Sequence, residues 1–325
     1  MLIRELIIEK LLKILTFAIP NKELRHKFRD DIMNNVKEWG EPKEFNKTVY
    51  TGEDVSTVIY DELSKNKPCL ICRYGINEFY AMRNYVVDGG LFFPRAVRKS
   101  MSESAGFFPP TQKNLRKFGK TIHSFAKDID ILGVKGREKL YCKKYIPENT
   151  RLVELDDVYS IYNENPWSRY LKGKKVLVIY QLDKKIEDQY KKREWLFKNP
   201  EILPEFELIT YKPVQSIADA KYGLPYKDWF EALEKMKEDI SKIDFDVALI
   251  GAGAYGIFLA HHCKMLGKQG IHLGGQTQLL FGIRGYRWDK FFPEWYCNAN
   301  LEHWIWPDDN EKPKGFEKVE DGCYW

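Results

Sequence analysis

The sequence has no uninterrupted apolar run long enough to cross a membrane, which excludes a hydrophobic transmembrane helix. It shows no signal-peptide pattern, no internal repeat and no low-complexity segment. The net charge of +5 on 325 residues is mild, and without a basic stripe it predicts no nucleic-acid partner. Because hydrophobic residues make up 44% and charged residues 30%, we expect a globular protein with a sizeable core.

Cysteine is also scarce, with six residues that are mostly far apart. Only Cys69 and Cys72 lie close together, and no second pair completes the four ligands of a zinc site. The apolar segment 68–73 reads as a buried strand, so we interpret these two thiols as packed core residues rather than as a redox or metal pair. This cysteine usage predicts a reducing, cytoplasmic location.

The first 45 residues are expected to form a helical extension, with helices near 2–17 and 22–38. Charged residues share one face of segment 2–19, which makes it amphipathic. Basic residues follow closely, namely Lys22, Arg25, Lys27 and Arg29. Two interpretations stay open: the segment lies on an anionic membrane at its inner face, or it packs on the protein body or at a dimer interface.

Residues 46–325 are expected to form one Rossmann-like domain with an irregular aromatic tail, 291–325, that wraps the body. Apolar strands are predicted at 68–73, 130–134, 174–180, 206–211, 245–250 and 270–273. Helices are predicted at 53–65, 77–84, 97–104, 111–127, 186–197, 229–240 and 254–266. This alternation predicts an α/β fold whose mostly parallel sheet is covered by helices on both faces.

A glycine motif follows the clearest strand. Gly251, Gly253 and Gly256 match G-x-G-x-x-G, with Tyr255 inside the motif, and a predicted helix follows. Gly251 permits a tight turn, Gly253 lets the backbone approach a phosphate, and the N–H groups of the helix start favour an anion. The motif therefore predicts a phosphate-binding loop, although a turn that merely packs closely is the alternative.

An NAD site would require an acidic residue about 20 positions after this motif. The corresponding segment, 270–276, contains no acid. The loop is therefore expected to hold a nucleotide diphosphate rather than to serve an NAD(P)-linked oxidoreductase.

A second glycine loop, 272–278, follows the next predicted strand. Neighbouring parallel strands end at the same crevice, so the two loops should form one pocket. The residues expected to bind the nucleotide there are His272, Gly274, Gly275 and Gln276, with Arg284 neutralising phosphate. The alternative for His272 is a buried, hydrogen-bonded histidine without a ligand.

A third turn lies after the strand at 68–73. Gly75 permits the turn, Arg73 precedes it, and Glu78 falls in the first turn of the next helix, where the helix dipole stabilises a carboxylate. Glu78 either caps the helix or acts at a strand end, where sheet enzymes place their chemistry. Arg73 and Glu78 are the predicted catalytic residues.

Together these stretches resemble the GT-D-type glycosyltransferase-fold proteins of bacterial surface-polysaccharide clusters. The resemblance covers roughly residues 68–290. It rests on Arg73–Phe79, Ala105–Pro109, Asn165–Ser168, Gly173–Ile179, Phe245–Gly256 and Ile271–Gly282, of which the last two are the most specific.

The resemblance implies a Rossmann-like fold, a nucleotide-sugar donor, with a UDP-sugar favoured, and a glycan or lipid-linked acceptor. Members of that family carry an Asp-x-Glu motif that meets Mn²⁺ or Mg²⁺ and the donor diphosphate. Here the matching positions are Ile76, Asn77 and Glu78, so only the Glu is kept. The loss of the Asp puts metal dependence in doubt and leaves Arg73 and later arginines as the source of positive charge.

The sequence therefore predicts a glycosyltransferase acting on a capsule, lipopolysaccharide or glycoprotein precursor. A non-catalytic nucleotide- or glycan-binding protein of a polysaccharide assembly complex is the first alternative, because the Asp is lost. An NAD(P)-linked oxidoreductase is the second.

Overall fold

The protein is described by a computed structural model over residues 3–21, 23–29, 32, 47–135, 146–319 and 322–325. Its centre is an eight-stranded sheet in the order β1-β4-β3-β2-β8-β7-β5-β6, and every pairing in it is parallel. The strands are β1 (Val49–Tyr50), β2 (Cys69–Arg73), β3 (Ile131–Val134), β4 (Arg151–Glu154), β5 (Lys175–Tyr180), β6 (Glu207–Tyr211), β7 (Val247–Gly251) and β8 (Gln269–His272). The predicted Rossmann-like parallel sheet is confirmed.

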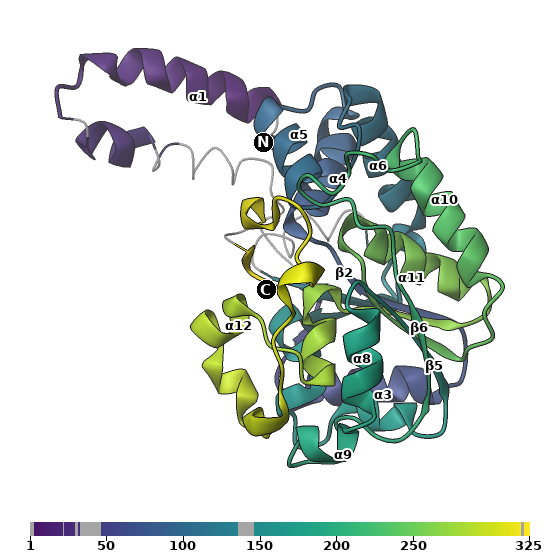
Figure 1. Cartoon of the computed structure of the whole chain (residues 1–325). Coiled ribbons are helices and arrows are strands. Elements are labelled where there is room, and N and C mark those ends of the chain that lie inside the picture. Colours follow the sequence, from purple (N-terminus) through teal and green to yellow (C-terminus); the bar gives the residue numbers. More distant parts are fainter. Residues whose placement is uncertain (1–2, 22, 30–31, 33–46, 136–145, 320–321) are drawn as a thin grey trace.

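Helices cover both faces of this sheet (Figure 1). One face carries α4 (Ile76–Asp88), α5 (Arg95–Glu103), α6 (Gln112–Phe125), α10 (Trp229–Ile240) and α11 (Gly256–Met265). The other carries α3 (Glu53–Ser64), α8 (Asp183–Tyr190), α9 (Arg193–Leu196) and α12 (Tyr286–Phe291). Strand β5 shows how two cores arise from one strand: Leu177 and Ile179 enter the first core, whereas Val176 and Val178 enter the second.

The two halves of the sheet meet where β2 pairs with β8, in the register Cys69↔Gln269. On the other side of β2, Arg73 pairs with Gly133, and on the other side of β8, Ile250 pairs with His272. All carboxyl ends of these strands therefore lie along one edge, which is where open parallel sheets place ligand sites.

Several elements differ from the sequence-based prediction. Strands β1 and β4 were not predicted, because they are short and lack a strong apolar run. The helix expected at 186–197 is broken into α8 and α9. The second glycine segment is a 3₁₀ helix, η7 (Gly274–Phe281), and not a loop.

The aromatic tail wraps the body as expected. Trp295 and Trp304 are buried in the second core. The tail is not wholly irregular, since α12 and several 3₁₀ turns lie within or beside it. The predicted boundary at residues 45 and 46 lies partly outside the described residues, as does most of the helix expected at 22–38.

The N-terminal part contains α1 (Ile3–Leu15), the 3₁₀ turn η1 (Thr16–Ala18) and a helical stretch at 23–29. Figure 1 shows α1 extending away from the sheet. Of the helices in the described part of the chain, none is both long and apolar enough to cross a bilayer.

Glycine is required inside β8 for a packing reason that can be tested. A Cβ atom on Gly270 would lie 2.3 Å from the backbone oxygen of Ala260 in α11, whereas one on Gly133 in β3 would meet the flexible end of Leu155 at 3.1 Å. We expect Gly270→Ala to lower the free energy of unfolding by about 1–3 kcal/mol through overpacking. Urea denaturation measures this, with Gly133→Ala as the matched control. Equal losses in both variants would contradict the backbone-contact argument.

Candidate functional site

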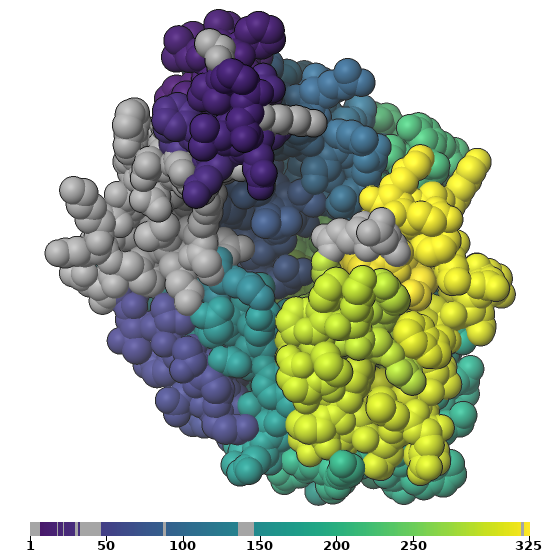
Figure 2. Space-filling model, turned by 90° about the vertical axis from the view of Figure 1, so that its left-hand side faces the viewer, coloured from purple at the N-terminus to yellow at the C-terminus, as the bar shows by residue number. Residues whose placement is uncertain are grey.

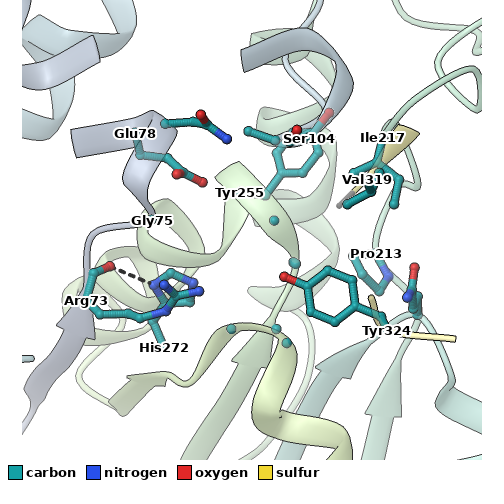
Figure 3. Close-up of a pocket in the computed structure, with 18 of the residues that line it drawn as sticks. Arg73, Gly75, Glu78, Ser104, Pro213, Ile217, Tyr255, His272, Val319 and Tyr324 are labelled. Carbon is teal, nitrogen blue, oxygen red and sulfur yellow. Dashed lines mark hydrogen bonds between the residues drawn. The ribbon is translucent and has the colours of Figure 1, made fainter. Parts of the chain in front are cut away.

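A cavity of about 470 Å³ lies at the carboxyl ends of the strands (Figure 3). Nine residues predicted from the sequence line it, namely Arg73, Gly75, Glu78, Gly251, Gly253, Tyr255, His272, Gly274 and Gly275. Three others, Gly256, Gln276 and Arg284, are not among its lining residues. The structure thus brings the three predicted turns together, although their residues are up to 200 positions apart in the chain.

The first two glycine segments touch directly. A Cβ on Gly251 would lie 2.2 Å from the Gly274 carbonyl oxygen and 2.6 Å from the Tyr180 ring. Gly253 has φ of +51°, a backbone conformation that side-chain-bearing residues rarely adopt. The N–H of Ala254 donates to the Ala105 carbonyl at 3.2 Å, so this amide is satisfied within the fold. The anion-binding donors expected from the motif are therefore fewer than the sequence suggests.

Gly256 serves packing rather than the cavity. It is the first residue of α11, and a Cβ there would lie 2.4 Å from Nε2 of His272. The motif's third glycine is thus explained by the buried imidazole behind it, which corrects its assignment to the diphosphate.

His272 is held as a neutral imidazole. Its Nδ1 lies 3.1 Å from the Arg73 carbonyl oxygen, which can only accept, so Nδ1 carries the proton and Nε2 is left as an acceptor (Figure 3). Burial, together with the positive charge of Arg73, lowers the pKa of His272 to about 3. At neutral pH this residue therefore binds by hydrogen bonding and carries no charge.

Glu78 is a buried carboxylate at the start of α4. Its side chain is folded over Gly75, where a Cβ would lie 2.0 Å from Oε2, so a larger residue at this position would displace the carboxylate. Burial raises the pKa of Glu78, and the residue's own backbone N–H and the charge of Arg73 oppose this without cancelling it. A carboxyl group with a raised pKa beside a cavity has the properties of a general base or acid.

Three cationic side chains line the same cavity, Arg73, Lys135 and Arg287. The Arg73 guanidinium lies against Gly274, where a Cβ would be 2.5 Å from its Nη2. Lys135 forms an ion pair with Asp156. The cavity therefore has more positive than negative charge, which suits an anionic ligand.

Arg284 has a different environment from the one predicted. It forms an ion pair with Asp289 and lies over the Trp306 ring at 5.0 Å. Arg287, three residues later, lines the cavity in its place. Gln276 lies within η7 and is not among the lining residues. The sequence could not separate the two arginines, because the ion pair of Arg284 with Asp289 depends on how the chain folds there.

The end of the described chain forms part of the cavity wall, which the sequence did not predict. The Tyr324 ring packs on Gly275, where a Cβ would lie 2.1 Å from Cε1. Gln278 donates to the Tyr324 carbonyl at 3.2 Å, and the Arg287 N–H donates to the Cys323 carbonyl at 3.0 Å. These contacts fix Tyr324 opposite Glu78 across the cavity (Figure 3).

A polar segment after β6 completes the wall, and it too was missed. Pro213, Gln215 and Ser216 line the cavity, and Gln215 is hydrogen-bonded to Gln181 at the end of β5. Ser216 donates to the Gly106 carbonyl at 2.7 Å, which ties the segment to the other half of the sheet. The only available signal was the position of this polar stretch directly after an apolar strand.

The donor set for a metal ion is poor. Of the residues that line the cavity, Glu78 is the one carboxylate, and Ile76 lies beside it with its side chain 58% exposed. Within the described ranges, no three His, Cys, Asp or Glu side chains come close enough to hold a metal ion. A divalent ion would therefore meet one carboxylate of the described lining, where an Asp-x-Glu motif supplies two.

A family model described as a GT-D fold-like domain matches residues 50–280. The matched range runs from β1 to η7 and includes all nine predicted residues that line the cavity. It ends before Arg287 and Tyr324. No curated protein and no solved structure matches the chain.

The low pKa of His272 should appear in the pH dependence of stability. Its pKa is near 3 in the folded protein and about 6.5 when unfolded, so the unfolded state binds more protons between these values. Stability therefore falls as pH drops below about 6.5. From pH 7 to 5 we expect His272→Asn to lose about 2 kcal/mol less free energy of unfolding than the wild type. Denaturant titrations measure this, with His303→Asn as control; parallel curves for wild type and His272→Asn would contradict it.

Proposed function

Because the chain belongs to the GT-D fold-like family, whose fold is glycosyltransferase-related, we propose that it is a glycosyltransferase. It moves a sugar from a nucleotide-sugar donor, with a UDP-sugar favoured, to an acceptor in bacterial surface-glycan assembly. One observation carries this proposal: the strand-end cavity joins the glycine turns, the cationic side chains and a buried carboxylate. Its volume of about 470 Å³ lies within the range of small-molecule sites.

The donor's diphosphate is assigned to the cationic side of the cavity. Arg73 and Arg287 supply fixed positive charge and N–H donors, and Lys135 adds a third cation. Stabilisation of the charge on a leaving diphosphate is the main demand of glycosyl transfer from a nucleotide sugar. Gly251 and Gly253 allow the donor to approach the backbone closely, because neither presents a side chain.

Glu78 is assigned to the acceptor hydroxyl. Its raised pKa makes it a better proton acceptor than an exposed carboxylate, provided that it is ionised when the acceptor binds. His272 keeps Arg73 in place through the Arg73 carbonyl and adds no charge of its own. We therefore assign Glu78 as the base and Arg73 as an electrostatic stabiliser.

We further propose that the transfer uses no divalent metal. The position that supplies an Asp in the Asp-x-Glu motif is Ile76 here, which leaves Glu78 as the one carboxylate of the described cavity lining. The arginines and the lysine provide the positive charge that a metal would otherwise give to the leaving group. The same loss of the Asp favours a second candidate, a protein that binds the donor without turning it over.

Donor binding tests the cationic side chains that line the cavity, Arg73, Lys135 and Arg287. Titration calorimetry with UDP-, GDP-, CMP- and dTDP-sugars, with Mn²⁺ and again with EDTA, should show one donor bound equally under both conditions. Arg287→Ala should weaken that binding about tenfold or more, because a charge-assisted hydrogen bond is lost. Arg284→Ala is the matched control and should leave the affinity unchanged, since Arg284 is paired with Asp289. Failure of every donor to bind would remove the support for a transferase, and binding only with Mn²⁺ would contradict the metal-free site.

Turnover tests Glu78. We expect Glu78→Gln to lower kcat by about 100-fold or more while the donor affinity stays within a few-fold, because the amide cannot accept the hydroxyl proton. In the wild type, activity should fall as pH drops through the raised pKa of Glu78. Glu103→Gln on α5 serves as the control and should keep wild-type rates. A wild type that binds the donor and shows no turnover would favour the non-catalytic candidate.

A further inference from the structure

The described N-terminal part of the chain presents a group of exposed apolar side chains. On α1, Ile7, Leu11, Ile14 and Leu15 are all exposed, Ile14 and Leu15 by 71% and 73%. After α1, Phe17 is 80% exposed, and Leu24 and Phe28 in the following helical stretch are about half exposed. We call these seven side chains the N-terminal apolar face. Large apolar side chains left in water at this density mark an interaction surface.

Helical geometry places the α1 members on one side. Their spacings of four, seven and eight residues put them on one face of the helix, as does the spacing of four between Leu24 and Phe28. Leu12 and Thr16, in contrast, are buried, so the opposite side of α1 is the one attached to the protein. Figure 1 shows α1 extending away from the sheet, and the exposed fractions of Ile14 and Leu15 show that this face is accessible.

Basic residues border the apolar face. At about 100° per residue, Lys10 lies next to Ile7 and Ile14 at the edge of the stripe, and Lys13 lies beyond it. Lys10 is exposed, and Lys13 is exposed but paired with Glu9 at 2.6 Å. The helical stretch at 23–29 adds Arg25, Lys27 and Arg29. An apolar stripe edged by lysine and arginine is complementary to the headgroups of an anionic bilayer.

Other occupants fit this face less well. A coiled coil with a second copy is disfavoured, since α1 has 13 residues and that motif is sustained over three to four heptads. Insertion across the bilayer is excluded for α1 by the same length. A helix of this length with an apolar and a basic side can lie in the plane of a membrane surface.

We propose that the N-terminal apolar face binds the surface of an anionic membrane. Figure 2 shows the N-terminal segment on the same face of the molecule as a central hollow. The assignment of a lipid-linked acceptor rests on the proposed transferase function, but membrane binding itself does not. Of the two interpretations that the sequence left open, this proposal takes the membrane.

Vesicle cosedimentation of the full chain tests the proposal. We expect binding to vesicles of phosphatidylcholine with phosphatidylglycerol, weak binding to phosphatidylcholine alone, and release by high salt.

Ile14→Ser combined with Phe17→Ser should weaken binding about tenfold or more, because two apolar side chains no longer enter the interface. Lys10→Glu combined with Lys27→Glu should abolish the preference for anionic lipid. The matched control, Met265→Ser combined with Trp195→Ser, changes two side chains of similar exposure elsewhere and should bind as the wild type does.

The outcomes separate this proposal from the proposed function. No vesicle binding by the wild type, or equal binding by both variants and the control, would overturn it. A wild-type dimer in solution that becomes a monomer in Ile14→Ser/Phe17→Ser, without vesicle binding, would assign the face to a second copy. The same variants should bind the donor as the wild type does. A wild type that binds no donor would count against the transferase and not against membrane docking.

Discussion

The pairing of β2 with β8 is the contact on which the cavity depends. These strands are about 200 residues apart in the chain, yet their register places Arg73 and His272 at the same edge of the sheet. The hydrogen bond between the His272 imidazole and the Arg73 carbonyl joins the two strand ends at 3.1 Å. Because the bond uses the Arg73 backbone, the guanidinium remains directed at the cavity. Without this pairing the two halves of the sheet would carry separate turns and no shared site.

Glycines make this junction possible by removing side chains where backbones meet. At Gly251, Gly256, Gly274 and Gly275 an added Cβ would lie within 2.6 Å of a neighbouring atom. The neighbours differ: a carbonyl, an imidazole, a guanidinium and a tyrosine ring. The glycine pattern therefore reflects a close-packed junction as much as an approach to phosphate. This is why a motif match alone could not tell Gly253, which lines the cavity, from Gly256, which packs on His272.

The parallel α/β fold could be predicted because its signals are local. The apolar strands β2, β5 and β7 lie between amphipathic helices, and the turns after β2 and β7 carry Gly75 and Gly253. What could not be predicted depends on distant contacts. Strands β1 and β4 are stabilised mainly by pairing with a sheet that already exists, and Tyr324 reaches the cavity only through the path of the tail around the body. The choice between Arg284 and Arg287 likewise depends on Asp289, which captures the first of them.

The positive charge of Arg73 affects the pKa of both titratable neighbours in the cavity, Glu78 and His272. Burial raises the pKa of Glu78, and the positive charge of Arg73 opposes that rise without cancelling it. The same charge, together with burial, keeps His272 neutral, so no second titrating cation competes for the carboxylate. In the transfer that we propose, the same cationic side chains would both receive the leaving diphosphate and set the basicity of Glu78.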